Sequence, residues 1–567
     1  MDSRLGLPQQ ALSKNEVKAS FQGQSANEEF DFDAKIERET VRKPSGSVTV
    51  TEGGLQIRAA ADVIMDPKPS NLPEDPLNWP RWKKEAAFGT LMIGTAVVGI
   101  LKTMLVTVNS VVAIESSVDY VAAAALTGAP LMFGALAGLM SQMSSQLFGK
   151  RGIYIGSAVL ILVGALWNMH VYNIYAQFMV SRIFQGIGWG MFEALISSSI
   201  ADLFFVHERG TRVNIHNVVS ISFTWGTPIV GGYVSQSVGG YRNQLMIASI
   251  LQAISILLLI FASPETTFDR ASSQPPSVDI APSKSSFKQY LDTLKFTNPH
   301  SISKFDVNAA LQPLKALIAP STILTTLLTA PLLGSAFGIA NSLSLMFSTM
   351  PTLLFPTRLG CLFVLPLIFS LLAYSLGAFL TYVRIKPPYH LGDSPAKTLT
   401  VAAPGLLIGV SGLLAFGMCI STELMPEVAG NSTAFEIKVA GMEISLQAVA
   451  AAFGMMVGGA VMLEYSGATY LSTFASPNRP GDSELAGAHH VLQELVVGIW
   501  VIGFPMWISG DGVMGGLENT ATAIGVLVAV IGGSVVVVLS IKGDVLRNID
   551  IGVLRRGPES GNGDGRI

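Results

Sequence analysis

Two charged side chains stand inside a long apolar stretch, where they could carry a proton or bind a charged solute. Arg182 and Glu193 both lie well within the run 173–204. An apolar helix of about 20 residues crosses the hydrocarbon core of a bilayer. A charge at that depth costs at least about 2.5 kcal/mol, so it usually faces a partner or a water-filled cavity. The run therefore predicts a membrane-spanning helix that carries a functional site.

The spacing of these two charges places them on one face of the helix. Eleven steps of about 100° come within about 20° of a whole number of turns, and Gln185 lies on the same stripe. A rise of about 1.5 Å per residue separates Arg182 from Glu193 by roughly 16 Å, which is too far for an ion pair. Each charge is therefore expected to have a partner of its own.

The composition indicates a membrane protein with many spans. Half of the 567 residues are hydrophobic and 13% are charged, and the mean hydropathy of +0.48 lies outside the range of soluble globular domains. No basic stripe with interleaved aromatic residues suggests nucleic acid. The sequence also lacks a phosphate-binding loop, a metal-spaced His/Cys cluster and a GxSxG serine, so we predict no enzyme activity, cofactor or resident metal.

Twelve apolar runs predict an all-α membrane protein with twelve transmembrane helices in two six-helix bundles. The runs lie at 86–113, 121–147, 152–170, 173–204, 213–237, 243–262, 321–350, 359–383, 398–420, 445–474, 488–509 and 520–541. We expect a disordered cytosolic tail at 1–84, the N-terminal bundle at 85–262, a cytosolic linker at 263–320, the C-terminal bundle at 321–545 and a cytosolic tail at 546–567.

Basic residues in the short loops predict the orientation, because Lys and Arg favour the cytosolic side of a membrane. Lys150 with Arg151, and Arg209 with Arg212, fall on the same side as the linker and the C-terminal tail. Both chain ends are therefore expected in the cytosol. Asn431 then lies outside in an N-x-T sequence and is a candidate glycosylation site. The plasma membrane is the expected location, and the vacuolar membrane is the alternative.

The run from Arg182 to Gly190, RIFQGIGWG, resembles the RxxQGxGxG motif in the fourth helix of the major facilitator superfamily. Downstream, Phe192-Glu193 and the segment 202–210, DLFFVHERG, resemble fungal members of the twelve-helix drug:proton antiporter branch and its polyamine-transporter-like relatives. The resemblance covers about residues 75–545, more clearly in the first half than in the second. It implies two halves that rock about a central site.

Lys102 and Asn109 form a second polar pair, seven residues apart and so on one face of the first predicted helix. In the family that the chain resembles, helices one and four line the central cavity. Lys102 and Glu193 stand at about 21 Å and 16 Å from the cytosolic ends of their helices, so we hypothesise that they interact. Snorkelling of Lys102 to an interface is the alternative.

A proton on Glu193 would release Lys102, as proton-coupled exchange requires. Glu464 could be a matching acid from the second half.

The loop after the second predicted helix resembles a conformational switch of the same family. The segment 146–151 matches the end of its loop motif, although Gln142 and Gln146 stand where a Gly and an Asp belong. The retained Gly149, Lys150 and Arg151 lie at the start of the third helix. Arg151 could pair with Asp202 as a latch, or the two basic residues could only anchor the loop on the cytosolic side.

The segment 226–232 on the fifth predicted helix resembles the antiporter motif that ends in GPxxGG, with Thr227 in place of a Gly. Pro228 is expected to kink the helix, and Gly231 and Gly232 would let a neighbour approach closely. Close packing alone is the alternative interpretation.

These observations predict a secondary transporter of the major facilitator type that couples protons to the export of small amphipathic compounds, such as drugs, toxins or secondary metabolites. Its partners would be the substrate, protons and the bilayer, and it is expected to be a monomer. A first alternative moves polyamines or other organic cations; Glu193 favours it, whereas two fixed cations, Lys102 and Arg182, oppose it. A second is a non-transporting receptor or scaffold, for which Gln142 and Gln146 are the hint.

Overall fold

The computed structural model describes residues 75–171, 173–268, 311–348, 353–385, 401–424, 446–472, 482–509 and 513–555. The chain divides into the units Met1–Ile64 and Met65–Ile567, and every described residue belongs to the second unit. All regular structure in the described ranges is helical, which confirms the all-α fold class. Asn431 and most of the predicted tails and linker lie outside the described residues.

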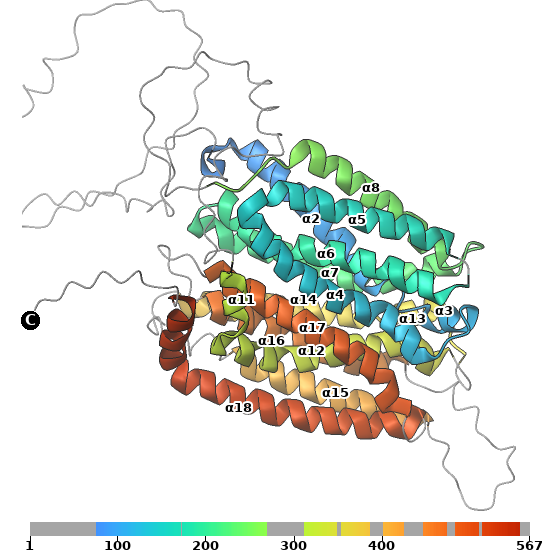
Figure 1. Ribbon diagram of the computed structural model, residues 1–567. Coiled ribbons are helices and arrows are strands. Elements are labelled where there is room, and N and C mark those ends of the chain that lie inside the picture. Colours follow the sequence, from blue (N-terminus) through green and yellow to red (C-terminus); the bar gives the residue numbers. More distant parts are fainter. Residues whose placement is uncertain are drawn as a thin grey trace, which may run out of the picture. The chain divides into compact units, whose positions relative to one another are not determined.

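The first half consists of six long helices and two short elements (Figure 1). The long helices are α2 (Arg81–Thr103), α4 (Tyr120–Phe148), α5 (Lys150–His170), α6 (Tyr175–Leu203), α7 (Val206–Ser235) and α8 (Arg242–Ala262). The short elements are η1 (Pro76–Asn78), which precedes α2, and α3 (Asn109–Glu115), which follows it.

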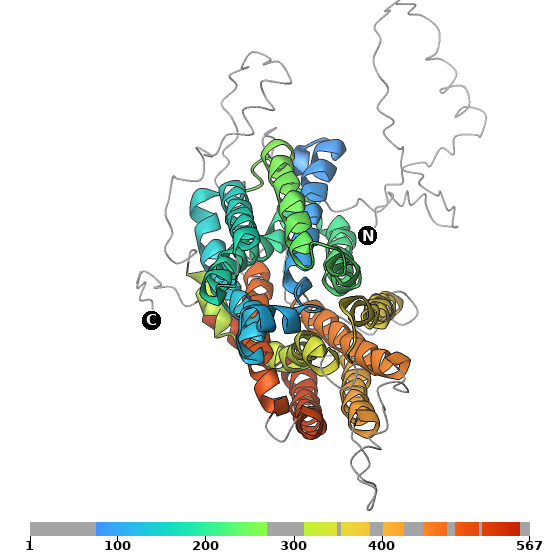
Figure 2. The ribbon, with the colours of Figure 1, turned by 90° about the vertical axis from the view of Figure 1, so that its right-hand side faces the viewer.

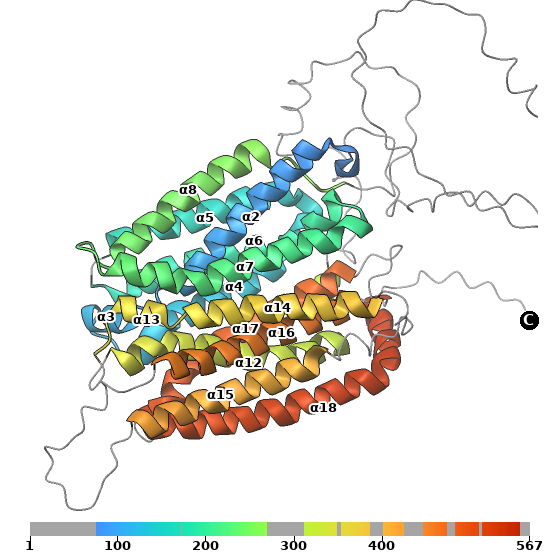
Figure 3. The ribbon, with the colours of Figure 1, turned by 180° about the vertical axis from the view of Figure 1, so that it is seen from behind.

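The second half likewise consists of six long helices and two short ones (Figure 3). Its long helices are α12 (Pro320–Phe347), α14 (Val364–Ile385), α15 (Ala402–Leu424), α16 (Leu446–Ser472), α17 (Asp482–Ser509) and α18 (Val513–Arg555). The short helices are α11 (Gln312–Leu317) and α13 (Pro356–Cys361). Thus α11 lies inside the predicted linker, and α18 continues beyond residue 545 to Arg555.

Ten spans in the described ranges are long and apolar enough to cross a membrane. Helices α6 and α7, with 29 and 30 residues, are also long enough to cross a membrane. Their polar and charged residues make them less apolar than the ten spans. Together they give the twelve membrane-spanning helices that the sequence predicts. Viewed along the helices, the blue to green first half and the yellow to red second half lie side by side (Figure 2).

The glycines of the RIFQGIGWG run explain how α6 is held in the first half. A Cβ atom added at Gly186 or Gly190 would lie well inside contact distance of the carbonyl oxygens of Pro130 and Gly134 on α4. One added at Gly188 would lie 2.7 Å from the Ser157 oxygen on α5. The motif therefore allows α6 to pack backbone to backbone against two neighbours, which fixes the face that carries Glu193.

The two halves meet mainly in two places: α4 packs along α17, and α7 packs against α13 and α14. At the second contact, a Cβ atom at Gly360 would lie 2.6 Å from the Pro228 oxygen. Gly232 likewise lies against Gly360, with 3.2 Å between an added Cβ atom and the Gly360 Cα atom. Pro228 and Gly232 therefore lie at the interface between the halves.

The first predicted helix, 86–113, is not continuous. Helix α2 ends at Thr103 and α3 begins at Asn109. Between them, Val106 N donates to Thr103 O at 3.2 Å and Val108 N donates to Leu105 O at 2.9 Å, which is the tighter pattern of three-residue turns. The apolar pattern of this run gave no sign of a break, because the residues of the break are themselves apolar or β-branched and buried.

Candidate functional site

The ammonium group of Lys102 lies between two carboxylates. Its Nζ atom is 2.6 Å from Glu193 Oε2 on α6 and 2.5 Å from Glu494 Oε1 on α17. The three side chains are only 9 to 11% exposed. The structure therefore brings Lys102 and Glu193 together, and it adds an acid from the other half of the molecule.

Three further titratable side chains surround this ion pair. His490 Nε2 on α17 is 3.9 Å from Glu193 Oε2. Glu464 on α16 interacts electrostatically with Lys102, Glu193 and Glu494. His216 on α7 interacts electrostatically with His490 and lies 3.4 Å from the hydroxyl of Thr95. We call Lys102, Glu193, Glu464, His490 and Glu494 the central cluster.

Sequence reasoning did not find the contribution of α17 to this cluster. From the sequence alone, the spacing of His490 and Glu494 predicts a hydrogen-bonded pair at the membrane interface, and His216 is expected to have only a structural role. Glu494 is 7% exposed and instead reaches Lys102 across the interface between the halves. The available signal was the same one that marked Glu193, namely an acid within an apolar run.

The backbone on both sides of Lys102 is held by polar contacts. Arg182 Nη2 donates to the carbonyl oxygen of Leu101 at 3.0 Å. The hydroxyl of Thr103 donates to Thr224 O at 2.7 Å. Thr224 O is the carbonyl that Pro228 leaves without a donor four residues later in α7. These contacts position Lys102 at the end of α2, just before the helix breaks.

Arg182 itself does not line a cavity, because it is fully buried. Its Nε donates to Leu126 O at 3.1 Å, and its Nη1 donates to Gln185 Oε1 at 2.7 Å. Gln185 is fully buried as well. The guanidinium group thus links α6 to the backbone of α2 and α4.

Asn109 lies at the interface between the halves and not beside Glu193. Its Nδ2 donates to the carbonyl oxygen of Asn341 on α12 at 3.0 Å and lies 3.2 Å from Asn341 Oδ1. The backbone N–H of Ser110 donates to the hydroxyl of Ser344 at 3.2 Å. These contacts join α3 to α12 on the side that the loop charges predict to be extracellular.

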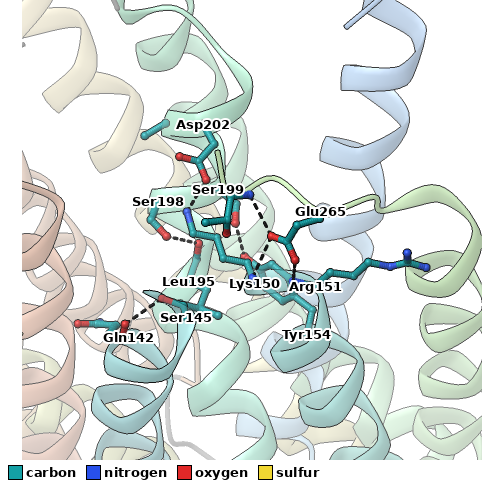
Figure 4. Close-up of polar contacts among 12 residues, drawn as sticks. Gln142, Ser145, Lys150, Arg151, Tyr154, Leu195, Ser198, Ser199, Asp202 and Glu265 are labelled. Atoms are coloured by element: carbon teal, nitrogen blue, oxygen red, sulfur yellow. Dashed lines mark hydrogen bonds and ion pairs between the residues drawn. The ribbon is translucent and has the colours of Figure 1, made fainter. Parts of the chain in front are cut away.

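A second group of charged residues lies at the end of the first half where α4 and α6 end and α5 begins (Figure 4). Lys150 Nζ is 2.5 Å from Asp202 Oδ2. Glu265, which follows α8, accepts the backbone N–H groups of Lys150 and Arg151, each at 3.0 Å. Gly149 has a φ of +80°, and a Cβ atom there would lie 2.6 Å from Glu265 Oε2. We call Lys150, Arg151, Asp202 and Glu265 the cytosolic cluster, after the side on which the loop charges predict it to lie.

The cytosolic cluster differs in detail from the sequence hypothesis, which paired Asp202 with Arg151. Lys150 points to Asp202, whereas the Arg151 side chain extends past Glu265 and donates to Ile260 O at 2.8 Å (Figure 4). From the sequence alone, the segment Pro264-Glu265-Thr266 indicates only the boundary at the end of the first half. The Glu265 carboxylate instead occupies the N-terminus of α5, where free N–H groups favour an acid.

Gln142 lies at the interface between α4 and α17, near the C-terminal end of α4. A Cβ atom added at Gly487 on α17 would fall within contact distance of the Gln142 amide. Among the described residues, neither polar atom of this amide has a hydrogen-bond partner. The side chain of Gln146 lies outside the described part of the structure.

Comparisons with known proteins give the family context of this arrangement. The model of a family described as Major Facilitator Superfamily matches residues 91–481. The chain is 28% identical over 225 residues to Protein HOL1 of Saccharomyces cerevisiae, covering 39% of this chain and 37% of that protein. It is 33% identical over 122 residues to the MFS antiporter QDR3 of Candida albicans, covering 22% and 17% of the two chains.

A third relative is the trichosetin biosynthesis cluster MFS transporter of Gibberella fujikuroi, 24% identical over 291 residues, with 49% of this chain and 56% of that protein covered. Each match spans less than two thirds of the relative's own length. Among solved structures, the partially occluded inward open form of the xylose transporter XylE from E. coli has a TM-score of 0.51 at 17% identity, covering 79% of this chain and 98% of that one. This likeness concerns the fold alone.

Proposed function

The chain belongs to the major facilitator superfamily and is a multi-pass membrane transporter, and we propose that it exports small amphipathic compounds in exchange for protons. The observation that carries the proposal is the ammonium group of Lys102, held by carboxylates from opposite halves. Membership of this family favours transport over catalysis.

Two carboxylates compete for one ammonium group in this cluster. Glu193 belongs to the same half as Lys102, whereas Glu494 belongs to the other half. A proton on Glu193 removes its charge, so Lys102 then pairs with Glu494 and the halves attract each other at this point. With Glu193 ionised, the attraction of Lys102 for Glu494 is weakened. Protonation of Glu193 thereby biases the equilibrium between the two arrangements of the halves, as coupling demands.

Two observations support the proposed class of substrate: the aromatic side chains between the halves and the names of the relatives. Aromatic side chains line the contact between the halves near the cluster: Trp225 packs on Phe337 and Phe453, and Tyr374 packs on Tyr465. Apolar and aromatic walls with a few polar groups suit loose recognition of many shapes. One relative is named as an antiporter, which supports an exchange mechanism, and another as the transporter of a biosynthesis cluster, which supports a natural compound as substrate.

Organic cations, polyamines among them, are a second candidate class of substrate. The sequence argument against them counted Arg182 as a fixed cation in the cavity, but Arg182 is fully buried and hydrogen-bonded to the protein. In the central cluster, the single ammonium group of Lys102 faces the carboxylates of Glu193, Glu464 and Glu494. With these acids ionised, the cluster carries a net negative charge that favours a cationic solute.

Transport by sealed vesicles with an imposed pH gradient tests the proposal. The panel contains labelled apolar drugs and polyamines, and native protein is compared with Glu193→Gln. The exposed Glu115, whose carboxylate accepts the hydroxyl of Tyr241, supplies the matched control Glu115→Gln. We expect gradient-dependent movement by the native protein and the control, and none by Glu193→Gln.

Each outcome of this experiment separates the candidates. Movement of polyamines alone would favour the second substrate class. Normal gradient-driven transport by Glu193→Gln would contradict the coupling role of Glu193. Movement of no compound by any variant would favour a non-transporting receptor on this fold.

A further inference from the structure

Part of the central cluster has the composition of a metal site. One ligand atom each from Glu193, His490 and Glu494 lie within 4.8 Å of one another. His490 and Glu494 stand four residues apart on α17, so both side chains project from one face of that helix. One imidazole and two carboxylates form a donor set that suits Zn²⁺ and similar divalent transition metals.

The position between these donors already attracts a cation. Lys102 Nζ lies 2.6 Å from Glu193 and 2.5 Å from Glu494. The second carboxylate oxygen of Glu494, Oε2, is buried and accepts no hydrogen bond from the described residues. Acceptor capacity in a buried site is therefore left over after Lys102 is bound, and an unsatisfied buried acceptor is costly.

A metal ion could reach these donors with small side-chain movements. Zinc binds nitrogen and carboxylate oxygen at about 2.0–2.2 Å, so tetrahedral donors stand about 3.4 Å apart. The observed separations of up to 4.8 Å must then shorten by little more than an ångström. The His490 side chain is 39% exposed, so this ligand is the least enclosed of the three.

We propose that Glu193, His490 and Glu494 bind a divalent transition-metal ion such as Zn²⁺, which displaces the ammonium group of Lys102 and joins the two halves. Glu193 is on α6 of the first half, and the other two ligands are on α17 of the second half. A bound ion therefore opposes any movement that separates α6 from α17. The ion acts as an inhibitor of the transport proposed above, and it competes with the proton for Glu193, because a carboxylate binds a metal in its ionised form.

The ammonium group of Lys102 competes with the metal ion for the two carboxylates, so variants of Lys102 should change the affinity for the ion. Removing the ammonium group leaves both carboxylates available, so Lys102→Met is expected to bind the ion more tightly. Replacing His490 by Gln removes the one nitrogen ligand while keeping a polar side chain of similar size. His170 lies at the end of α5, exposed and hydrogen-bonded to Leu166 O of its own helix, so His170→Gln is the matched control.

The experiment measures binding of Co²⁺ and Zn²⁺ to the purified full-length protein in lipid nanodiscs. Equilibrium dialysis gives the affinity for Zn²⁺, and the visible absorption of bound Co²⁺ reports its ligands. We expect one saturable ion per chain, a loss of affinity of about tenfold or more in His490→Gln, and a gain of about tenfold in Lys102→Met. The His170→Gln control should match the native protein.

Two results of the binding experiment would contradict the proposal. Absence of saturable binding by both the native protein and Lys102→Met would overturn the proposal. Binding that is unchanged in His490→Gln and in Glu193→Gln would overturn it as well, because the ion would then lie elsewhere. These measurements need no transport, so their failure is distinguishable from failure of the proposed function.

Discussion

The central and cytosolic clusters both place a lysine beside a carboxylate, but they differ in which parts of the molecule they join. Lys150, Asp202 and Glu265 all belong to the first half, whereas Lys102 is shared between Glu193 of the first half and Glu494 of the second. A contact within one half can stay intact while the halves move. A contact between the halves must change when they do. The central cluster is therefore suited to coupling, and the cytosolic cluster to holding α5, α6 and the end of α8 in place.

The largest expected effect is that of Lys102→Ala. It leaves two facing carboxylates without their common cation, and removing one partner of a buried ion pair costs about 3–5 kcal/mol. Gradient-driven transport in vesicles should fall at least about 100-fold, equivalent to about 2.7 kcal/mol in the barrier. Transport within a factor of a few of the native rate would contradict the assignment of Lys102 to the coupling centre.

Thr103→Val tests the support next to Lys102. The substitution keeps the shape of the side chain but leaves Thr224 O without the hydroxyl that satisfies it. A buried unsatisfied carbonyl costs about 1–3 kcal/mol, so the initial rate of transport should fall about tenfold. The isosteric change at Thr90, Thr90→Val, whose hydroxyl bonds to Ala86 O of its own helix, is the control and should have a smaller effect. Equal effects of the two variants would show that the contact at Thr103 has no special role.

Lys150→Ala breaks the corresponding ion pair of the cytosolic cluster. Asp202 is 23% exposed, so water can compensate for part of the lost partner, and the stability cost should be about 1 kcal/mol. Thermal unfolding should shift to lower temperature, while transport remains dependent on the pH gradient. Loss of gradient dependence in this variant would mean that the cytosolic cluster also takes part in coupling.

Glu265→Gln should have the smallest effect. A carboxamide can still accept one of the two N–H groups at the start of α5, but it loses the charge that the helix terminus favours. The expected loss of stability is about 0.5–1 kcal/mol, measured by thermal unfolding, with an unchanged rate of transport. A transport defect as large as that of Thr103→Val would contradict a purely structural role of this cap.

The sequence predicted the helices and the contact of Lys102 with Glu193, but not the contact of Lys102 with Glu494 between the halves. Depth along a helix can be counted from its ends, and this count brought Lys102 and Glu193 together. It cannot show which residues of different halves face each other, so Glu494 and His490 were placed at an interface. The break after Thr103 was missed because it depends on distant partners, Arg182 and Thr224, and not on the local pattern.

The most direct test measures the distance between the halves in variants that leave Lys102 with only one of its two carboxylate partners, Glu193 or Glu494. Spin labels at the exposed residues His207 on α7 and Lys542 on α18 would be placed in protein whose native cysteines are replaced, and distances measured by pulsed electron resonance. Glu193→Gln leaves Lys102 to Glu494, and Glu494→Gln leaves it to Glu193. We predict that the two variants shift the distance distribution in opposite directions from the native one, with Lys150→Ala unchanged. Shifts in the same direction, or none, would contradict a coupling centre in which two carboxylates compete for Lys102.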